Sequence, residues 1–158
     1  TIDIPNLRKA IQNFSKDLYL VDTTISRDAT EKLSNLKKEK NSAKFIKNLL
    51  EIATQFIENC KSLNEKDIQE LLEITMIKAW KIKRQMYGVM TQELINIEKN
   101  ILKNDFYVLK LLGAGGGGYF LVLFKGSNIK ESISKLEKCG LNIRKIELSN
   151  EGCSTCIF

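Results

Sequence analysis

Apolar residues recur at helical spacing over three long stretches of this chain. In residues 42–61 they follow one another three or four positions apart, and the same spacing returns after Asn64 and in residues 92–103. This spacing places apolar side chains on one face of a helix, so it predicts three amphipathic helices with buried faces. The second helix runs through Trp80 and ends before Gly88, where glycine favours a break.

Shorter apolar runs predict the strands and two further helices. Residues 18–21, 108–112 and 119–124 are rich in β-forming side chains and predict strands. Residues 7–14 predict a short helix, Ser26 is a candidate N-cap for another, and residues 128–138 predict a helix that Gly140 ends. Residues 142–148 alternate imperfectly and predict an edge strand. Mixed strands and helices in a chain of this length indicate one α+β domain.

Four consecutive glycines stand between two of the predicted strands. The run begins with Gly113 and Ala114 and continues through Gly115, Gly116, Gly117 and Gly118. One or two glycines satisfy a plain hairpin, and a flexible linker would bring serine, proline or charge. Glycine allows positive φ and a close approach of the backbone to a ligand. The run therefore favours a functional turn over a simple hairpin loop, which stays the alternative.

Residues 110–120, KLLGAGGGGYF, resemble the third motif of the GHMP kinases, the group of galactokinase, homoserine, mevalonate and phosphomevalonate kinases. Residues 23–27, TTISR, and residues 79–84, AWKIKR, resemble segments of the bacterial D-glycero-D-manno-heptose phosphate kinases of that group. The resemblance implies the C-terminal domain of such a kinase. Its fold would be a ferredoxin-like antiparallel sheet, with helices packed on one face and an added helical subdomain.

The resemblance also implies site residues and cofactors. The segment from Gly113 to Gly118 would border the phosphates of ATP, with Mg²⁺ as the second cofactor. Arg27, Lys83 and Thr91 would contact a sugar or sugar-phosphate substrate. Residues 89–95, VMTQELI, depart from the family's substrate stretch, which leaves the sugar open and makes an N-cap the favoured role of Thr91. No residue is assigned as catalytic, because the family's catalytic aspartate belongs to the other half.

The family's N-terminal half holds ATP with a loop of the form Pro-x-x-Gly-Leu-x-Ser-Ser, which is absent here, since the only proline is Pro5. We therefore expect residues 1–158 to form one domain, inactive alone, whose partner is the N-terminal kinase half. The expected function is the substrate-cleft half of an ATP-dependent kinase for a sugar phosphate, with heptose phosphate first. The alternative is a degenerate, non-catalytic half that binds a small ligand or a partner protein and self-associates through an uncovered apolar face.

Charge and aromatic residues disfavour a nucleic-acid partner. The net charge is +6, but the lysines are scattered among acidic residues, which is typical of a solvated surface. Tyr119, Phe120 and Phe124 would have to be exposed on the sheet to stack on bases, and we expect them in the core. The chain shows neither a signal-peptide pattern nor an apolar run of membrane-spanning length, so we expect a cytoplasmic location and no membrane contact.

The four cysteines favour free thiols over a metal site. The chain has no histidine, and Cys153 and Cys156 are its only closely spaced pair. They fall in a predicted final strand, where side chains three positions apart face opposite sides of a sheet. We therefore expect no bound metal.

Overall fold

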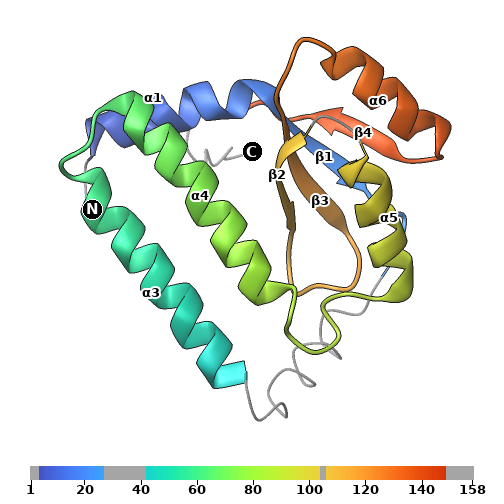
Figure 1. The fold of residues 1–158 in the computed structure, drawn as a ribbon, viewed down its shortest axis with the longest axis horizontal. Coiled ribbons are helices and arrows are strands. Elements are labelled where there is room, and N and C mark those ends of the chain that lie inside the picture. Colours follow the sequence, from blue (N-terminus) through green and yellow to red (C-terminus); the bar gives the residue numbers. More distant parts are fainter. Residues whose placement is uncertain (1–3, 27–41, 104–105, 149–158) are drawn as a thin grey trace, which may run out of the picture.

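The computed structural model describes residues 4–26, 42–103 and 106–148 (Figure 1). The helices predicted from apolar spacing and the strand over residues 119–124 are confirmed, whereas the helix expected after Ser26 and the Cys153–Cys156 segment lie outside the described residues. In chain order the elements are α1 (Pro5–Phe14), a 3-10 turn (Ser15–Asp17), β1 (Leu18–Asp22), α3 (Ser42–Cys60), α4 (Glu65–Lys83), α5 (Gln92–Leu102), β2 (Phe106–Leu111), β3 (Tyr119–Phe124), α6 (Ile129–Lys138) and β4 (Asn142–Lys145).

The four strands form one antiparallel sheet in the order β2-β3-β1-β4. The order along the chain is strand, helices, two strands, helix and strand, which is the ferredoxin-like arrangement predicted from the resemblance. β3 and β1 are the two inner strands and pair from Leu18↔Leu123 to Asp22↔Tyr119. The loop between β2 and β3 therefore emerges beside the end of β1.

One face of the sheet carries the main core. Val21, Phe120, Val122 and Phe124 project from alternate positions of β1 and β3 and are fully buried. They pack with residues of α5 and α6, which lie together on one side of the sheet (Figure 1). The period of two in β3 explains this pattern, since every second side chain of a strand faces the same way.

The added helical subdomain covers the other face of the sheet. Leu18 and Leu123 pack there with Phe14 and with partly buried residues of α4, Leu72 and Met76. Beyond them, α1, α3 and α4 pack together around a small cluster of Ala10, Cys60 and Ile68. In Figure 1 the pair α3 and α4 forms a layer beside the sheet. The predicted fold class is thus confirmed.

Two details of the sheet differ from prediction. Tyr119 is 39% exposed, so its predicted place in the core is wrong, whereas Phe120 and Phe124 are buried as predicted. Tyr119 faces away from Phe120 because neighbouring strand residues alternate. β4 ends at Lys145 rather than Leu148, and the bond from Ile146 N to Leu18 O (2.9 Å) extends the contact with β1 by one residue.

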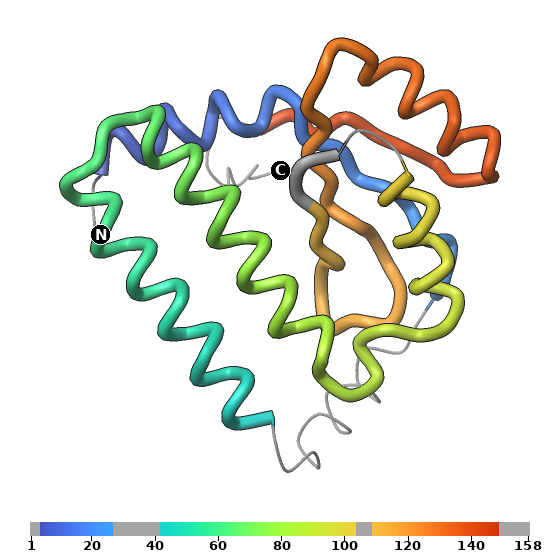
Figure 2. The backbone as a smooth tube through the Cα atoms, viewed as in Figure 1, coloured from blue at the N-terminus to red at the C-terminus, as the bar shows by residue number. Residues whose placement is uncertain are grey.

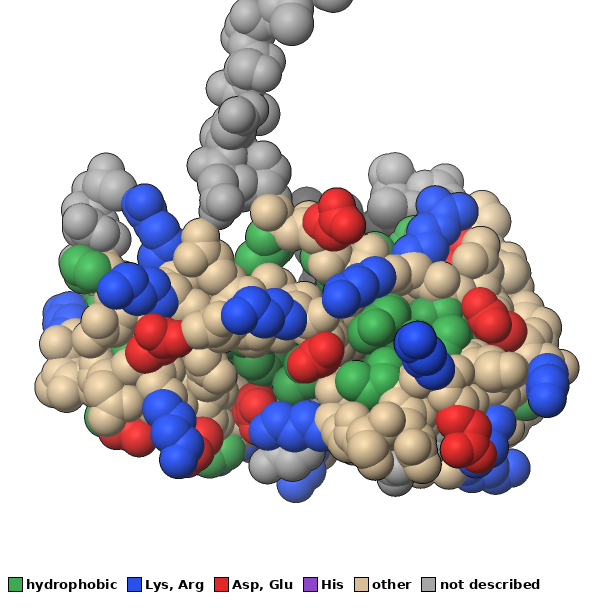
Figure 3. All heavy atoms as spheres, turned by 90° about the horizontal axis from the view of Figure 1, so that it is seen from above, with side chains coloured by type: hydrophobic (Ala, Val, Ile, Leu, Met, Phe, Trp, Pro, Cys, Tyr) green, Lys and Arg blue, Asp and Glu red, His purple; other side chains and the backbone are tan. Residues whose placement is uncertain are grey.

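Basic and acidic side chains are interspersed on the face of the molecule shown in Figure 3. Exposed side chains of opposite charge also form pairs, such as Lys135 with Glu131 at 2.8 Å. Pairs this exposed add little stability and mainly keep the surface solvated. None of the helices in the described ranges has both the length and the apolar character needed to span a bilayer.

Candidate functional site

The loop between β2 and β3 has a shape that only glycine adopts easily. Gly113, Gly115, Gly116 and Gly118 have φ angles of 67°, 96°, 72° and 86°. Residues with a Cβ are strained in this region, which explains why the sequence needs so many glycines here. Gly115, Gly116 and Gly117 are buried, so the loop folds against the protein instead of projecting into solvent.

The turn between α4 and α5 packs directly on the middle of this loop (Figure 2). The amide of Gly116 donates a hydrogen bond to Val89 O at 2.7 Å. A Cβ at Gly115 would lie only 2.8 Å from the Cα of Val89. The two backbones therefore touch, and position 115 has no room for a side chain.

The end of β1 holds the other end of the loop. The carbonyl of Gly118 accepts hydrogen bonds from both Thr23 N (2.9 Å) and Thr23 Oγ1 (2.7 Å). The amide of Gly118 donates to Ile25 O at 3.2 Å. Thr23 is almost fully buried, so these bonds are shielded from water. The loop is thus fixed to β1 as well as to the turn after α4.

Thr24, the next residue, is backbone-strained. Its φ is 55°, which is unusual for a β-branched side chain. Its amide donates to Asp22 Oδ1 at 2.8 Å, and its hydroxyl donates to Thr23 O at 2.7 Å. Strained residues of this kind cluster at functional sites. From this segment the sequence predicted only Arg27 as a substrate-binding residue, and Arg27 lies outside the described residues.

Lys83, the last residue of α4, reaches the start of the loop. Its Nζ donates to Leu111 O at 2.8 Å and to Gly113 O at 2.5 Å. Burial, together with the nearby charge of Lys110, lowers the pKa of Lys83 to about 8. These bonds join Lys83, one of the predicted substrate residues, to the glycine loop. Its contact with a substrate stays a prediction.

The lowered pKa of Lys83 predicts a pH-dependent stability. The ordinary pKa is 10.5, so between pH 8 and pH 10.5 the unfolded chain holds a proton that the folded chain has released. The free energy of unfolding therefore rises with pH in this window. After allowance for solvent screening, we expect wild type to gain about 1 kcal/mol over K83M between pH 7.5 and pH 10. Urea unfolding measures it, and a constant difference between the two proteins would contradict it.

A buried carboxylate joins α5 to the end of α4. Glu98 Oε1 accepts from Trp80 Nε1 at 3.2 Å, and Glu98 Oε2 accepts from Arg84 Nη2 at 2.6 Å. Trp80 also contacts Phe120 edge-on, with ring centroids 6.1 Å apart. This cluster fixes both sides of the turn that carries Val89. The sequence did not single out Glu98, because a lone glutamate in a helix resembles any surface residue.

Thr91 is the N-cap of α5. Its Oγ1 accepts a hydrogen bond from Leu94 N at 3.3 Å, and Glu93 follows in the first turn. This is the capping geometry that the sequence favoured for it. A substrate contact by Thr91 stays a prediction.

Replacing Thr91 with alanine should lower the free energy of unfolding by about 1 kcal/mol, the usual cost of losing an N-cap oxygen. Thr91→Ser keeps the oxygen and serves as the control, with little loss expected. Urea denaturation of the three proteins measures the effect. Equal stability of wild type and T91A would show that the cap contributes nothing.

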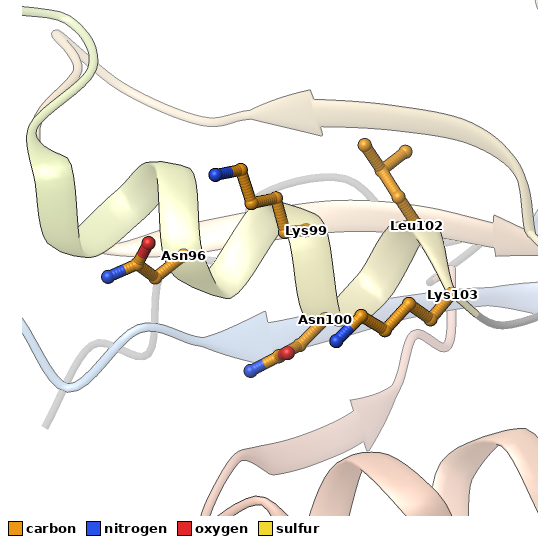
Figure 4. A pocket seen from close by; sticks show the side chains of 5 residues that line it. All are labelled: Asn96, Lys99, Asn100, Leu102 and Lys103. Carbon is orange, nitrogen blue, oxygen red and sulfur yellow. The ribbon is translucent and has the colours of Figure 1, made fainter.

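A shallow depression of about 420 Å³ lies along the exposed side of α5, away from the glycine loop. Figure 4 shows the side chains that line it, which are Asn96, Lys99, Asn100, Leu102 and Lys103. All five belong to α5 or to its C-cap, and four of them are exposed. It is an open surface without converging buried groups, so the candidate site remains the glycine loop.

Among solved structures the chain is similar to a mevalonate kinase, with a TM-score of 0.64 and 20% identity over 91% of this chain. It is also similar to the mevalonate kinase of Methanococcus jannaschii, with a TM-score of 0.62 and 21% identity over 84% of this chain. The L. major mevalonate kinase in complex with R-mevalonate gives a TM-score of 0.58 and 25% identity over 77%. The fold is that of a GHMP kinase C-terminal domain.

The chain spans only part of these kinases, namely 42%, 40% and 38% of their lengths. No protein-family model and no curated protein matches the chain. The predicted resemblance to GHMP kinases is therefore confirmed at the level of fold. None of the three structures named here is a heptose phosphate kinase, so that narrower likeness stays a prediction.

Proposed function

We propose that this chain is the substrate-cleft domain of an ATP-dependent kinase that phosphorylates an alcohol group of a small molecule. The observation that carries the proposal is the buried glycine loop, held in left-handed geometry from two sides within the fold of the mevalonate kinases. A sugar phosphate, with heptose phosphate first, is the proposed substrate, because residues 23–27 and 79–84 resemble segments of heptose phosphate kinases.

The loop offers backbone donors to the phosphates of ATP. Gly116 and Gly118 already donate to carbonyls of the chain, so the proposed phosphate donors are the amides of Gly113, Ala114 and Gly117. The two glycines have no side chain and Ala114 has only a methyl group, so phosphate oxygens can approach these amides closely. With bound Mg²⁺, ATP supplies the phosphoryl group, and the protein positions the reacting groups and stabilises their charge.

No residue of this chain is assigned to Mg²⁺. In the described ranges no three Asp, Glu, Cys or His side chains are grouped to hold a metal ion. In kinases Mg²⁺ is held by one or two carboxylates together with the phosphates of the nucleotide. The proposal gives this chain the loop and the substrate side of the cleft.

The proposed substrate side comprises Arg27, Lys83 and Thr91. Two of the three N–H donors of Lys83 are already bound to carbonyls, so at most one remains for a substrate phosphate. Arg27 is the better proposed phosphate ligand, because a guanidinium binds phosphate through two parallel hydrogen bonds.

The proposed partner is the N-terminal half of the same kinase, in the cytoplasm, where ATP is available. Without that half, self-association is the expected behaviour. Ile46 and Leu50 on α3 are 58% and 65% exposed, and apolar side chains of this size favour association when they adjoin.

Mevalonate is the second candidate substrate. The L. major enzyme to which this chain is 25% identical holds R-mevalonate, and it covers more than three quarters of the chain. Mevalonate carries a carboxylate where a heptose phosphate carries a phosphate, so both would be attracted by the same cationic side chains.

The experiment measures ATP consumption by the chain alone and by the chain joined to the coding sequence that precedes it. Heptose phosphates, hexoses and mevalonate serve as substrates. We expect turnover only in the joined form and with a heptose phosphate, and the joined Gly116→Val variant should be inactive. Turnover with mevalonate would identify mevalonate as the substrate in place of a heptose phosphate. Absence of turnover in either form would favour a non-catalytic binding module.

A further inference from the structure

Lys83 bridges two carbonyls that belong to different parts of the chain's central hairpin. Leu111 is the last residue of β2, and Gly113 is the first glycine of the loop. Between them, Leu112 N donates to Tyr119 O at 2.9 Å and closes the hairpin. The ammonium of Lys83 therefore binds the backbone at the junction between β2 and the loop.

The position of β2 in the sheet explains why the hydrogen bonds of Lys83 are important. β2 is an edge strand, so carbonyls on its open side have no neighbouring strand to donate to them. Lys83 donates to one such carbonyl at 2.8 Å and to the turned carbonyl of Gly113 at 2.5 Å. Charge-assisted hydrogen bonds are roughly twice as strong as neutral ones.

Lys83 completes a set of attachments around the loop. Its middle is held by Val89 O through Gly116 N, and its end by Thr23 through Gly118 O. At the start of the loop, Lys83 adds two hydrogen bonds beside the hairpin bond of Leu112 N. Both of these added bonds come from one side chain, so a single substitution removes them.

We propose that Lys83 is a positioning residue, which holds the first half of the glycine loop in the geometry required for phosphoryl transfer. It acts through the backbone of Leu111 and Gly113, and any contact with the substrate is secondary. This role rests on the proposed function only in one respect, namely that the loop borders the transferred phosphoryl group. The fixation of the loop itself is a property of this chain.

The first experiment uses this chain without any assay of activity. Amide hydrogen exchange is followed by NMR in wild type, in K83M and in the control K81M, which removes an exposed charge two residues earlier on the same helix. In K83M we expect exchange at Leu112 and Gly116 to accelerate about tenfold or more, as expected for the loss of a charge-assisted bond. Ile68, whose amide donates to Asn64 O far from the loop, should keep its protection.

Two results of this experiment overturn the proposal. Unchanged exchange at Leu112 and Gly116 in K83M shows that Lys83 does not hold the loop. Equal acceleration at Ile68 shows a general loss of stability instead of a local role. Should K83M not fold, wild type still decides, because ¹⁵N NMR of the Lys83 ammonium must show through-bond couplings to the carbonyls of Leu111 and Gly113, and their absence overturns the proposal.

The second experiment uses the chain joined to its preceding coding sequence. We expect K83M to lower kcat about tenfold to a hundredfold, with the KM of the alcohol substrate changed about twofold or less, because misplacement of a loop acts on the transition state. A raised KM with unchanged kcat would make Lys83 a substrate ligand and overturn the proposal. If joined wild type is inactive, the proposed function fails while the exchange result stands, so the two failures are distinguishable.

Discussion

Replacing Gly115 with alanine should lower the free energy of unfolding by about 3 kcal/mol or more. Two costs add at this position. A Cβ at φ 96° is strained, and the same Cβ would stand 2.8 Å from the Cα of Val89, which real contacts essentially never reach. The nearest atom belongs to the backbone, so no rotation of a side chain can relieve the clash. The turn after α4 and the glycine loop would have to separate.

The matched control is Gly113→Ala. Gly113 also has positive φ, at 67°, but no atom lies within 4 Å of the position its Cβ would take. The free energy of unfolding of G113A should fall only by the cost of a left-handed backbone, about 1 kcal/mol. Urea denaturation of both variants isolates the contact with Val89. Equal losses in G115A and G113A would show that the close approach of the two backbones contributes nothing to stability.

The sequence predicts most elements of this fold because its apolar patterns are strong and local. The helix expected over residues 92–103 is observed as Gln92–Leu102, and the strand expected over residues 119–124 has the observed bounds. The helix predicted over residues 7–14 begins earlier, at Pro5, since proline fits the first turn of a helix. The predicted bounds of an element are wrong where the apolar pattern is weak, as in β4, whose alternation is imperfect.

The candidate site is less visible in the sequence, for two physical reasons. The glycine run shows that a special turn is present, but its partners Thr23 and Val89 come from distant segments. Val89 acts through its backbone, which carries no side-chain signature. Lys83 likewise contacts backbone carbonyls, which carry no sequence signature. From its sequence, Lys83 was predicted to bind an anionic substrate, whereas in the structure it donates to carbonyls of the loop and of the strand before it.

Buried polar side chains on helices are the hardest to predict. Glu98 is 3% exposed on α5, where Leu94 and Ile101 form the buried face that the apolar spacing predicts. Leu102 of the same helix is 46% exposed. The spacing of apolar residues predicts which face of a helix is buried, but it does not predict which charged side chains form pairs. Glu98 is buried because Trp80 and Arg84 meet it there, and both come from the preceding helix end.

Replacing Glu98 with alanine should lower the free energy of unfolding by about 3 kcal/mol, because it leaves a buried indole N–H unpaired and a space in the core. The variant leaves the indole N–H of Trp80 without its acceptor beneath the sheet and leaves Arg84 without its partner. Arg84 is about half exposed and regains water, so most of the loss comes from the unpaired indole and the vacated space. Urea denaturation measures it.

Two further variants separate the contributions at Glu98. Glu98→Gln keeps an oxygen for Trp80 and removes only the charge, so its loss should be about half that of E98A. Glu93→Gln changes an exposed glutamate on the same helix and should cost about 0.5 kcal/mol or less. The turn that carries Val89 lies between Arg84 and α5, so E98A should also accelerate amide exchange at Gly116, whereas E93Q should not. Equal losses in E98A and E93Q would show that the buried cluster does not hold this turn.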